Sequence, residues 1–242
     1  MQKEKLHIVK TPFTGVMNDS PETILPPGFP RDFGLKELPE ELSAFKRLAR
    51  QVDFQVYFPF AYSLSRFGFR KGDRLLAIGL GKIPFNPISA ALIGGHVVAV
   101  ESDGKSVESC EQFTLNLTPG KIGNAIRAAG GRIEYVSGDF TRMRGMEGRF
   151  RTVLLPNVLN QPRNPKVDEI ASKALTAVED GGHVILSDSH KRTGNDEEAI
   201  LRRAADRLGF RLVPIKPANF GVIPIGLKDV TMDYAFRVEK TG

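Results

Sequence analysis

Two glycines and two acidic residues stand where three apolar segments of the chain end. Gly79 and Gly81 follow the first segment, Glu101 the second and Asp139 the third. Glycines let a backbone turn tightly and pass close to a ligand. A carboxylate at the second position can accept hydrogen bonds from ribose hydroxyls, and one at the third can accept from an adenine amino group. In this order, the residues indicate a nucleoside-containing cofactor.

Polar residues also follow the next two apolar segments. Pro156-Asn157 comes after the fourth, and Asp188 and His190 come after the fifth. Ligands of an open parallel sheet bind beyond the carboxyl ends of the strands, so these residues are expected near the reacting groups. His190 could deprotonate an acceptor hydroxyl or amine, and Asp188 beside it is a second catalytic candidate. The alternative interpretation is that His190, which two cationic residues follow, lies in a solvated loop.

The apolar segments alternate with amphipathic ones, which predicts how these residues are positioned. Strands are expected at 74–78, 96–100, 132–136, 152–155, 183–187, 210–215 and 232–238, and helices at 87–93, 106–117, 122–129, 167–178 and 196–208. A turn at Asp180-Gly181-Gly182 is expected to lead into the fifth strand, and Gly209 to cap the last helix. Continuous apolar strands separated by helices predict a doubly wound α/β fold, with a mostly parallel sheet and helices on both faces.

Composition excludes several kinds of site. The single cysteine, Cys110, allows no intrachain disulfide and no zinc site built from several thiolates. It is expected to be a small buried packing residue. The four histidines are scattered without metal-ligand spacing, so no metal is expected. His96 and His183 open predicted strands at the end away from the cofactor, where a structural role is expected.

Charge and hydropathy point to a cytoplasmic protein. There are 34 Lys and Arg against 28 Asp and Glu, a net charge of +6. This surplus is compatible either with an anionic partner or with ordinary surface residues. The N-terminus lacks a secretory apolar region, and the most apolar stretch, 88–100, is too short to span a bilayer.

The first 70 residues differ from the rest and are expected to form an N-terminal arm and helical cap. Six prolines precede residue 40, and a helix is expected after Pro39. Seven aromatic residues gather within 54–69. This aromatic stretch has three interpretations, namely core packing against the sheet, the lid of an apolar substrate pocket, or a stacking platform for nucleic acid.

The glycine segment distinguishes between two kinds of cofactor. A nicotinamide dinucleotide favours Gly-x-Gly-x-x-Gly, in which a helix N-terminus faces the pyrophosphate. Pro84 occupies the third glycine position here, and Pro87 follows it. S-adenosylmethionine (SAM) has no phosphate and does not require that approach.

From about Lys71 to Glu239 the chain resembles the class I, Rossmann-like SAM-dependent methyltransferases. The resemblance lies in LLAIGLG, VVAVESD, SGDF, FRTVLLPNVLNQ and AVEDGGHVILSD. It implies a seven-stranded sheet whose last strand is antiparallel and lies beside the fifth. It also implies a SAM-binding domain over 71–242. The implied cofactor residues are Gly79, Leu80, Gly81, Glu101, Ser102, Asp139, Phe140, Pro156 and Asn157, with Leu80 and Pro156-Asn157 near the methionine part.

The sequence departs from the family pattern at three positions. Ala77 stands where the family usually has an acid, Ile83 where it often has a third glycine, and Arg151 where the fourth strand usually opens with an acid. Three functions therefore stay open. They are a methyltransferase with an altered pocket, a transferase of the aminocarboxypropyl group of SAM, and a non-catalytic SAM- or nucleoside-binding module. The second function is suggested by the Gly-Lys-Ile-Pro turn, which resembles that of nicotianamine synthases.

The expected partner is a small or medium-sized, partly apolar acceptor molecule. The segment Leu155-Pro156-Asn157-Val158 lacks the Pro-Pro-aromatic sequence typical of enzymes that methylate base amino groups, which argues against nucleic acid. Arginines at 142, 144, 149 and 151 could still form a basic patch. A homo-oligomer is compatible with the sequence.

Overall fold

The computed structural model describes the chain in nine ranges, which carry a seven-stranded sheet and its helices. These ranges are 60–61, 64–65, 67–80, 84–116, 121–156, 158–159, 164–189, 196–215 and 231–240. The strands are β1 (Arg74–Ile78), β2 (His96–Glu101), β3 (Arg132–Ser137), β4 (Phe150–Pro156), β5 (Val178–Ser189), β6 (Phe210–Ile215) and β7 (Thr231–Lys240). The helices between them are α4 (Phe85–Leu92), α5 (Gly104–Asn116), α6 (Lys121–Ala129), the short 3₁₀ helix η4 (Phe140–Arg142), α7 (Val167–Ala177) and α8 (Glu197–Leu208).

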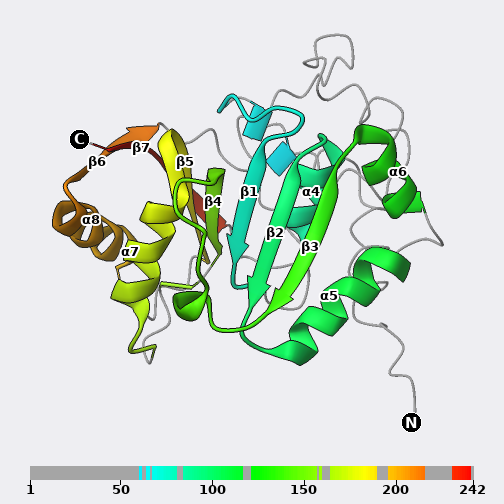
Figure 1. Ribbon diagram of the computed structural model, residues 1–242, viewed down its shortest axis with the longest axis horizontal. Coiled ribbons are helices and arrows are strands. Elements are labelled where there is room, and N and C mark those ends of the chain that lie inside the picture. Colours follow the sequence, from blue (N-terminus) through cyan, green and yellow to red (C-terminus); the bar gives the residue numbers. More distant parts are fainter. Residues whose placement is uncertain are drawn as a thin grey trace.

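The sheet has the predicted mostly parallel topology. Its strand order is β3-β2-β1-β4-β5-β7-β6. Strands β1 to β5 pair in parallel, whereas β7 lies antiparallel between β5 and β6. Figure 1 shows β1, β2 and β3 as neighbouring arrows that point the same way. The carboxyl ends of these three strands therefore meet at one edge, and the predicted fold class is confirmed.

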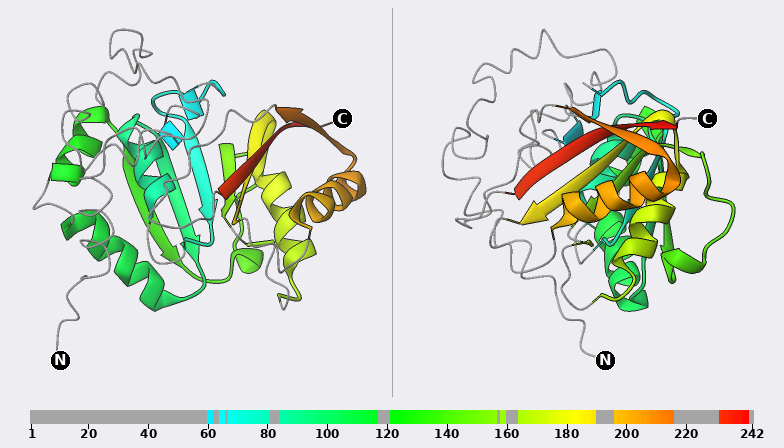
Figure 2. Two further views of the ribbon diagram at one scale, coloured as in Figure 1. Left: turned by 180° about the vertical axis from the view of Figure 1, so that it is seen from behind. Right: turned by 90° about the vertical axis from the view of Figure 1, so that its left-hand side faces the viewer.

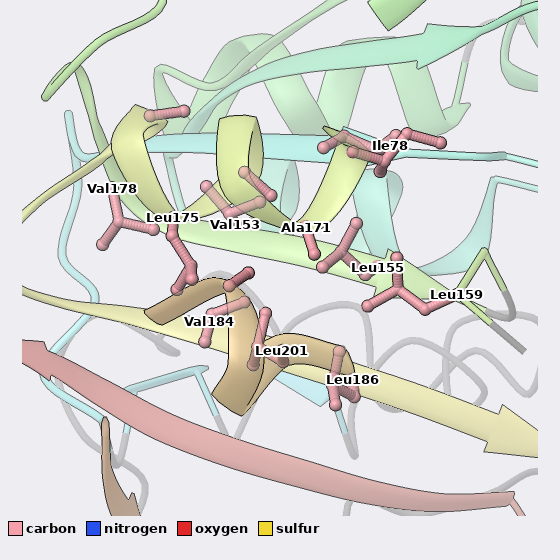
Figure 3. Close-up of a cluster of buried hydrophobic side chains, with 14 of the residues drawn as sticks. Ile78, Val153, Leu155, Leu159, Ala171, Leu175, Val178, Val184, Leu186 and Leu201 are labelled. Atoms are coloured by element: carbon pink, nitrogen blue, oxygen red, sulfur yellow. The ribbon is translucent and has the colours of Figure 1, made fainter. Parts of the chain in front are cut away.

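Helices cover both faces of the sheet because its central strands are apolar on both sides. In β1, Leu75 and Ala77 pack into one buried cluster with α4, α5 and α6, while Leu76 and Ile78 pack into another with α7 and α8. The second cluster joins β4 and β5 to α7 and α8 (Figure 3). The view from behind in Figure 2 shows the α4–α6 side of the molecule. Alternate burial of this kind is typical of parallel sheets in doubly wound folds.

The fifth strand is longer than the sequence predicted. β5 begins at Val178, directly after α7, and includes the Asp180-Gly181-Gly182 segment where a turn was expected. Val178 pairs with Phe150, whereas His183 pairs with Thr152, so the register shifts between the two pairings. Gly181 has a φ of +70° within this irregularity. The glycine segment thus forms a bulge inside the strand, because pairing with β4 continues on both sides of it.

Helix boundaries otherwise follow the local signals closely. Asp196 caps α8, where its carboxylate accepts a hydrogen bond of 3.1 Å from the Ala199 amide. Gly209 ends the helix in the left-handed conformation, at a φ of +68°. α4 begins at Phe85, before Pro87, because proline is tolerated in the first turn of a helix.

Most of the predicted N-terminal arm and cap lies outside the described residues, as does the helix expected after Pro39. Of the aromatic stretch at 54–69, the structure describes three phenylalanines. Phe60 and Phe69 are buried in the cluster under α4, and Phe67 packs against it. For these three the core-packing interpretation is confirmed. In the described ranges, no helix is long and apolar enough to cross a membrane.

Candidate functional site

The turn after β1 brings its backbone close to the segment that follows β4. Gly79 has a φ of +80°, and a Cβ added there would lie 2.4 Å from Cγ2 of Val158. The Gly79 amide donates to the Val100 carbonyl at 2.9 Å, which holds the turn against the end of β2. Only glycine meets both the conformation and the close contact.

Glu101, the last residue of β2, connects that turn with the segment after its own strand. Its Oε2 accepts a hydrogen bond of 3.0 Å from the Leu80 amide. Its Oε1 accepts from Ser102 Oγ at 3.0 Å and from the Asp103 amide at 3.2 Å. These hydrogen bonds hold the carboxylate at the carboxyl ends of β1 and β2. Leu80 itself is buried there.

Asp139 occupies the equivalent place after β3 and caps η4. Its Oδ1 accepts from the Thr141 amide at 3.0 Å and from Thr141 Oγ1 at 2.7 Å. Its Oδ2 accepts from Lys166 Nζ at 2.6 Å, and Arg142 Nε lies 3.5 Å away. The Lys166 hydrogen bond, followed by that of Thr141, lowers the pKa of Asp139 to about 2. Asp139 is therefore ionised throughout the physiological range.

Helix α7 holds the segment after β3 at a second point. Lys173 Nζ donates to the Thr141 carbonyl at 2.8 Å and to the Met143 carbonyl. The same ammonium lies 5.4 Å from the centre of the Phe140 ring, which is buried. This arrangement fixes the turn that presents Asp139.

A cavity of about 300 Å³ opens between these turns and the start of α7. Five of the residues predicted to bind a cofactor line it, namely Gly79, Glu101, Ser102, Asp139 and Phe140. The other lining residues are Ile78, Val100, Gly138, Val158, Asn164, Lys166 and Ile170. The cavity therefore has apolar walls, with carboxylates from two different strands at its rim.

Of the remaining predicted residues, the structure describes Pro156 and the backbone of Asp188. Pro156 ends β4, and Asp188 lies near the carboxyl end of β5 with its Cα opposite that of Met232. Gly81, Asn157 and the catalytic candidate His190 lie outside the described residues. The predicted roles of Asp188 and His190 in catalysis therefore stay predictions.

Sequence reasoning missed Lys166 and Asn164. Both precede α7, a helix to which the sequence analysis gave no part in the site, and neither belongs to a motif. Their place at the cavity follows from the meeting of α7 with the turn after β3. The apolar wall residues Ile78 and Val100 could have been found, because each is the last apolar residue of a strand whose end was expected at the site.

Two of the three departures from the family pattern have contacts that the structure describes. Ala77 is fully buried in β1 and packs into the cluster under α4. Arg151 pairs with Glu179, and the Nη1–Oε1 distance is 3.0 Å. Ile83 lies outside the described residues.

Cys110 and His183, which were expected to be structural, are buried and do not line the cavity, whereas His96 is half-buried at the start of β2. Cys110 is fully buried, and desolvation raises its pKa to about 11, so the thiol is inert at neutral pH. His183 is 5% exposed. No group of three or more His, Cys, Asp or Glu side chains in the described part of the chain could hold a metal ion.

No family model matches the chain, and the search of curated proteins finds no match. Solved structures do match. Magnesium protoporphyrin IX methyltransferase from Synechocystis PCC 6803, solved with bound SAM, aligns with a TM-score of 0.53 and 18% identity over 84% of this chain and 85% of that one. A TehB-like SAM-dependent methyltransferase from Corynebacterium glutamicum aligns with a TM-score of 0.52 and 14% identity, over 81% of this chain and 97% of that one.

An arsenic(III) SAM methyltransferase from Chlamydomonas reinhardtii aligns with a TM-score of 0.48 and 16% identity, over 71% of this chain. The chain spans 65% of the length of that protein. At these identities, the two matches with TM-scores of 0.53 and 0.52 define the fold alone. Together with the strand order, they show that the chain has the fold of the class I SAM-dependent methyltransferases.

Proposed function

We propose that this chain binds SAM and transfers its methyl group to a small or medium-sized, partly apolar acceptor. The observation that carries this proposal is the cavity at the carboxyl ends of β1, β2 and β3. Glu101 ends β2, Asp139 lies in the turn after the neighbouring β3, and Gly79 in the turn after β1 lines the same cavity.

The residues at the cavity fit an adenosyl group. Glu101, whose Oε2 accepts one bond from the Leu80 amide, places a carboxylate where a ribose hydroxyl can donate to it, and Asp139 places one for the adenine amino group. Ile78, Val100 and Phe140 supply apolar surface for the flat base. A cavity of about 300 Å³ is of the size that proteins use for small ligands. The methyltransferase fold supports the same assignment.

In this proposal the protein contributes position rather than covalent chemistry. SAM would supply a methyl group bonded to a positively charged sulfur. The acceptor's nucleophile would bond to the methyl carbon in line as the carbon–sulfur bond breaks, and S-adenosylhomocysteine would leave with the electron pair. The turns after β1 and β2 would hold the nucleoside, and the residues at the carboxyl ends of β4 and β5 would align the acceptor. Alignment and the exclusion of water can supply much of the rate of such a displacement. A base is needed only if the acceptor arrives protonated, and Asp188 and His190 are the predicted candidates.

Calorimetric titration of the purified chain with SAM and with S-adenosylhomocysteine tests the cofactor proposal. We expect both to bind and to raise the midpoint of thermal unfolding. NAD serves as the control ligand. It should bind weakly, and it should leave the midpoint of thermal unfolding unchanged. Absence of binding by both adenosyl compounds would refute the proposal.

The products separate methyl transfer from the alternative reaction. Incubation with SAM and a panel of small amines, phenols and thiols should release S-adenosylhomocysteine. Release of methylthioadenosine instead would identify aminocarboxypropyl transfer. Tight binding without either product over the whole panel would favour a non-catalytic SAM-binding module.

A further inference from the structure

Lys166 places a positive charge on the wall of the cavity that holds the adenosyl group in the proposed function. Its ammonium lies 2.6 Å from Asp139 Oδ2, and the side chain is 41% exposed. Neither the sequence motifs nor the methyltransferase fold assigns a role to this lysine. The inference that follows rests on the proposed function and names one further contact within the same site.

The backbone of Lys166 is fixed where α7 begins. Lys166 is the N-cap residue of α7, and its amide donates to Asn164 Oδ1 at 3.0 Å. Asn164 also lines the cavity. The side chain therefore reaches Asp139 from a well-defined helix start, and the contact joins α7 to the turn after β3.

The hydrogen bonds of Asp139 leave little room for a ligand. A carboxylate oxygen can accept about two hydrogen bonds. Both positions on Oδ1 are used by Thr141, whereas Oδ2 accepts one bond from Lys166 and has Arg142 Nε at the longer distance of 3.5 Å. A ligand donor that binds Asp139 must therefore take the remaining position on Oδ2, directly beside the Lys166 ammonium.

The described residues use only part of the hydrogen-bond donors of the Lys166 ammonium. Lysine carries three N–H donors. Among the described residues, Asp139 is the one hydrogen-bond acceptor of Lys166 Nζ, so two donors remain. A ligand bound at Asp139 Oδ2 thus meets an acceptor and a donor side by side.

Adenine presents the complementary pattern, because its amino group stands between two ring nitrogens that accept hydrogen bonds, N1 and N7. We propose that Lys166 binds the cofactor directly and donates a hydrogen bond to one of these ring nitrogens, next to the amino group held by Asp139. Phe140 and Ile170 line the same cavity and supply apolar surface for the base. A charge-assisted bond is stronger than a neutral one.

A cycle that combines one protein change with one ligand change tests the contact. The proteins are wild type and Lys166→Met, and the ligands are S-adenosylhomocysteine and its 1-deaza and 7-deaza analogues, in which a CH group replaces N1 or N7. Calorimetry gives the dissociation constant for each pair. In the wild type, we expect one of the two analogues to bind about tenfold more weakly than the parent, the scale of a lost charge-assisted hydrogen bond. In K166M that preference should fall to within twofold.

Lys173→Met is the matched control, because Lys173 lies on the same helix and binds the same turn but does not line the cavity. K173M should keep the wild-type preference between parent and analogue, even if its overall affinity falls. Lys166→Arg retains a cationic donor and should retain part of the preference. Thermal unfolding of each variant checks that it is folded.

The outcomes separate the inference from the function on which it rests. If the wild type binds S-adenosylhomocysteine but the analogue preference is absent, or persists unchanged in K166M, the Lys166 contact is wrong and the proposed function stands. If the wild type does not bind S-adenosylhomocysteine, both are wrong.

Discussion

Glu101 joins two of the turns at the cavity through its side chain. Its carboxylate accepts hydrogen bonds from Leu80 in one turn and from Ser102 and Asp103 in the other. The sequence predicted this residue as a ligand of ribose from its place after the second strand. The sequence could not show that the same side chain also anchors the glycine turn, because that bond depends on how far β1 and β2 extend alongside each other.

Replacement of Glu101 by Gln separates these two roles. A glutamine can still accept the Leu80 hydrogen bond through its one carbonyl oxygen, but it loses the charge and the second acceptor. We expect E101Q to weaken the binding of S-adenosylhomocysteine by about 1.5–3 kcal/mol, the scale for a lost charge-assisted hydrogen bond. Glu108→Gln removes an exposed carboxylate from α5 and should leave the affinity unchanged. Calorimetry measures both, and equal affinities for E101Q and E108Q would remove Glu101 from the site.

The elements that frame the cavity were predicted with uneven success. Each of the seven strands was found, because the apolar runs and their glycine or acidic ends are local signals. The contact of Lys166 with Asp139 was not found, because 27 residues separate them in the chain and α7 carries no motif at its start. The sequence predicted a turn where the structure has the bulge in β5. Glycines are typical of both, and the bulge depends on how β5 pairs with Phe150 and Thr152 of β4, which the local sequence does not show.

The turn after β1 packs against the segment after β4, and this packing predicts how a substitution of Gly79 changes the free energy of unfolding. Gly79→Ala should lower the free energy of unfolding through two effects, the φ of +80° and the clash of the new Cβ with Val158. Gly145→Ala is the control for the first effect, because Gly145 has a φ of +70° and open space around its Cα. A left-handed conformation alone costs an alanine about 1–2 kcal/mol. We expect G79A to lose more than G145A in denaturant titrations.

Val158→Ala should relieve part of that clash. In a cycle of G79A, V158A and the double variant, the double variant should lose less stability than the sum of the two single losses. Simple additivity, together with equal losses for G79A and G145A, would show that the two turns are not packed as described.

The molecule as a whole buries both faces of its sheet, and this places the ionisable side chain of His183 in the interior. His183 in β5 pairs in register with Thr152 of β4, and its ring centre lies 5.6 Å from that of Phe67. Among the residues that the structure describes, His183 Nδ1 and Thr152 Oγ1 have no hydrogen-bond partner. Desolvation, with smaller effects of Arg151 and Arg237, lowers the pKa of His183 from 6.5 to about 4. The histidine is therefore neutral in the folded protein at pH 7.

This burial predicts how the stability of the whole fold depends on pH. Between pH 6.5 and about pH 4 the unfolded chain protonates His183 while the folded protein does not, so the free energy of unfolding must fall as the pH falls through this window. The contribution of His183 to that loss is about 3 kcal/mol, since each unit of pKa shift corresponds to about 1.4 kcal/mol. His183→Leu cannot take up the proton and suits the apolar side facing Phe67. Urea titrations at pH 7, 6, 5 and 4 should therefore show a shallower decline for H183L, with the difference from wild type growing toward pH 4. A constant difference at all four pH values would mean that water reaches His183 in the folded protein.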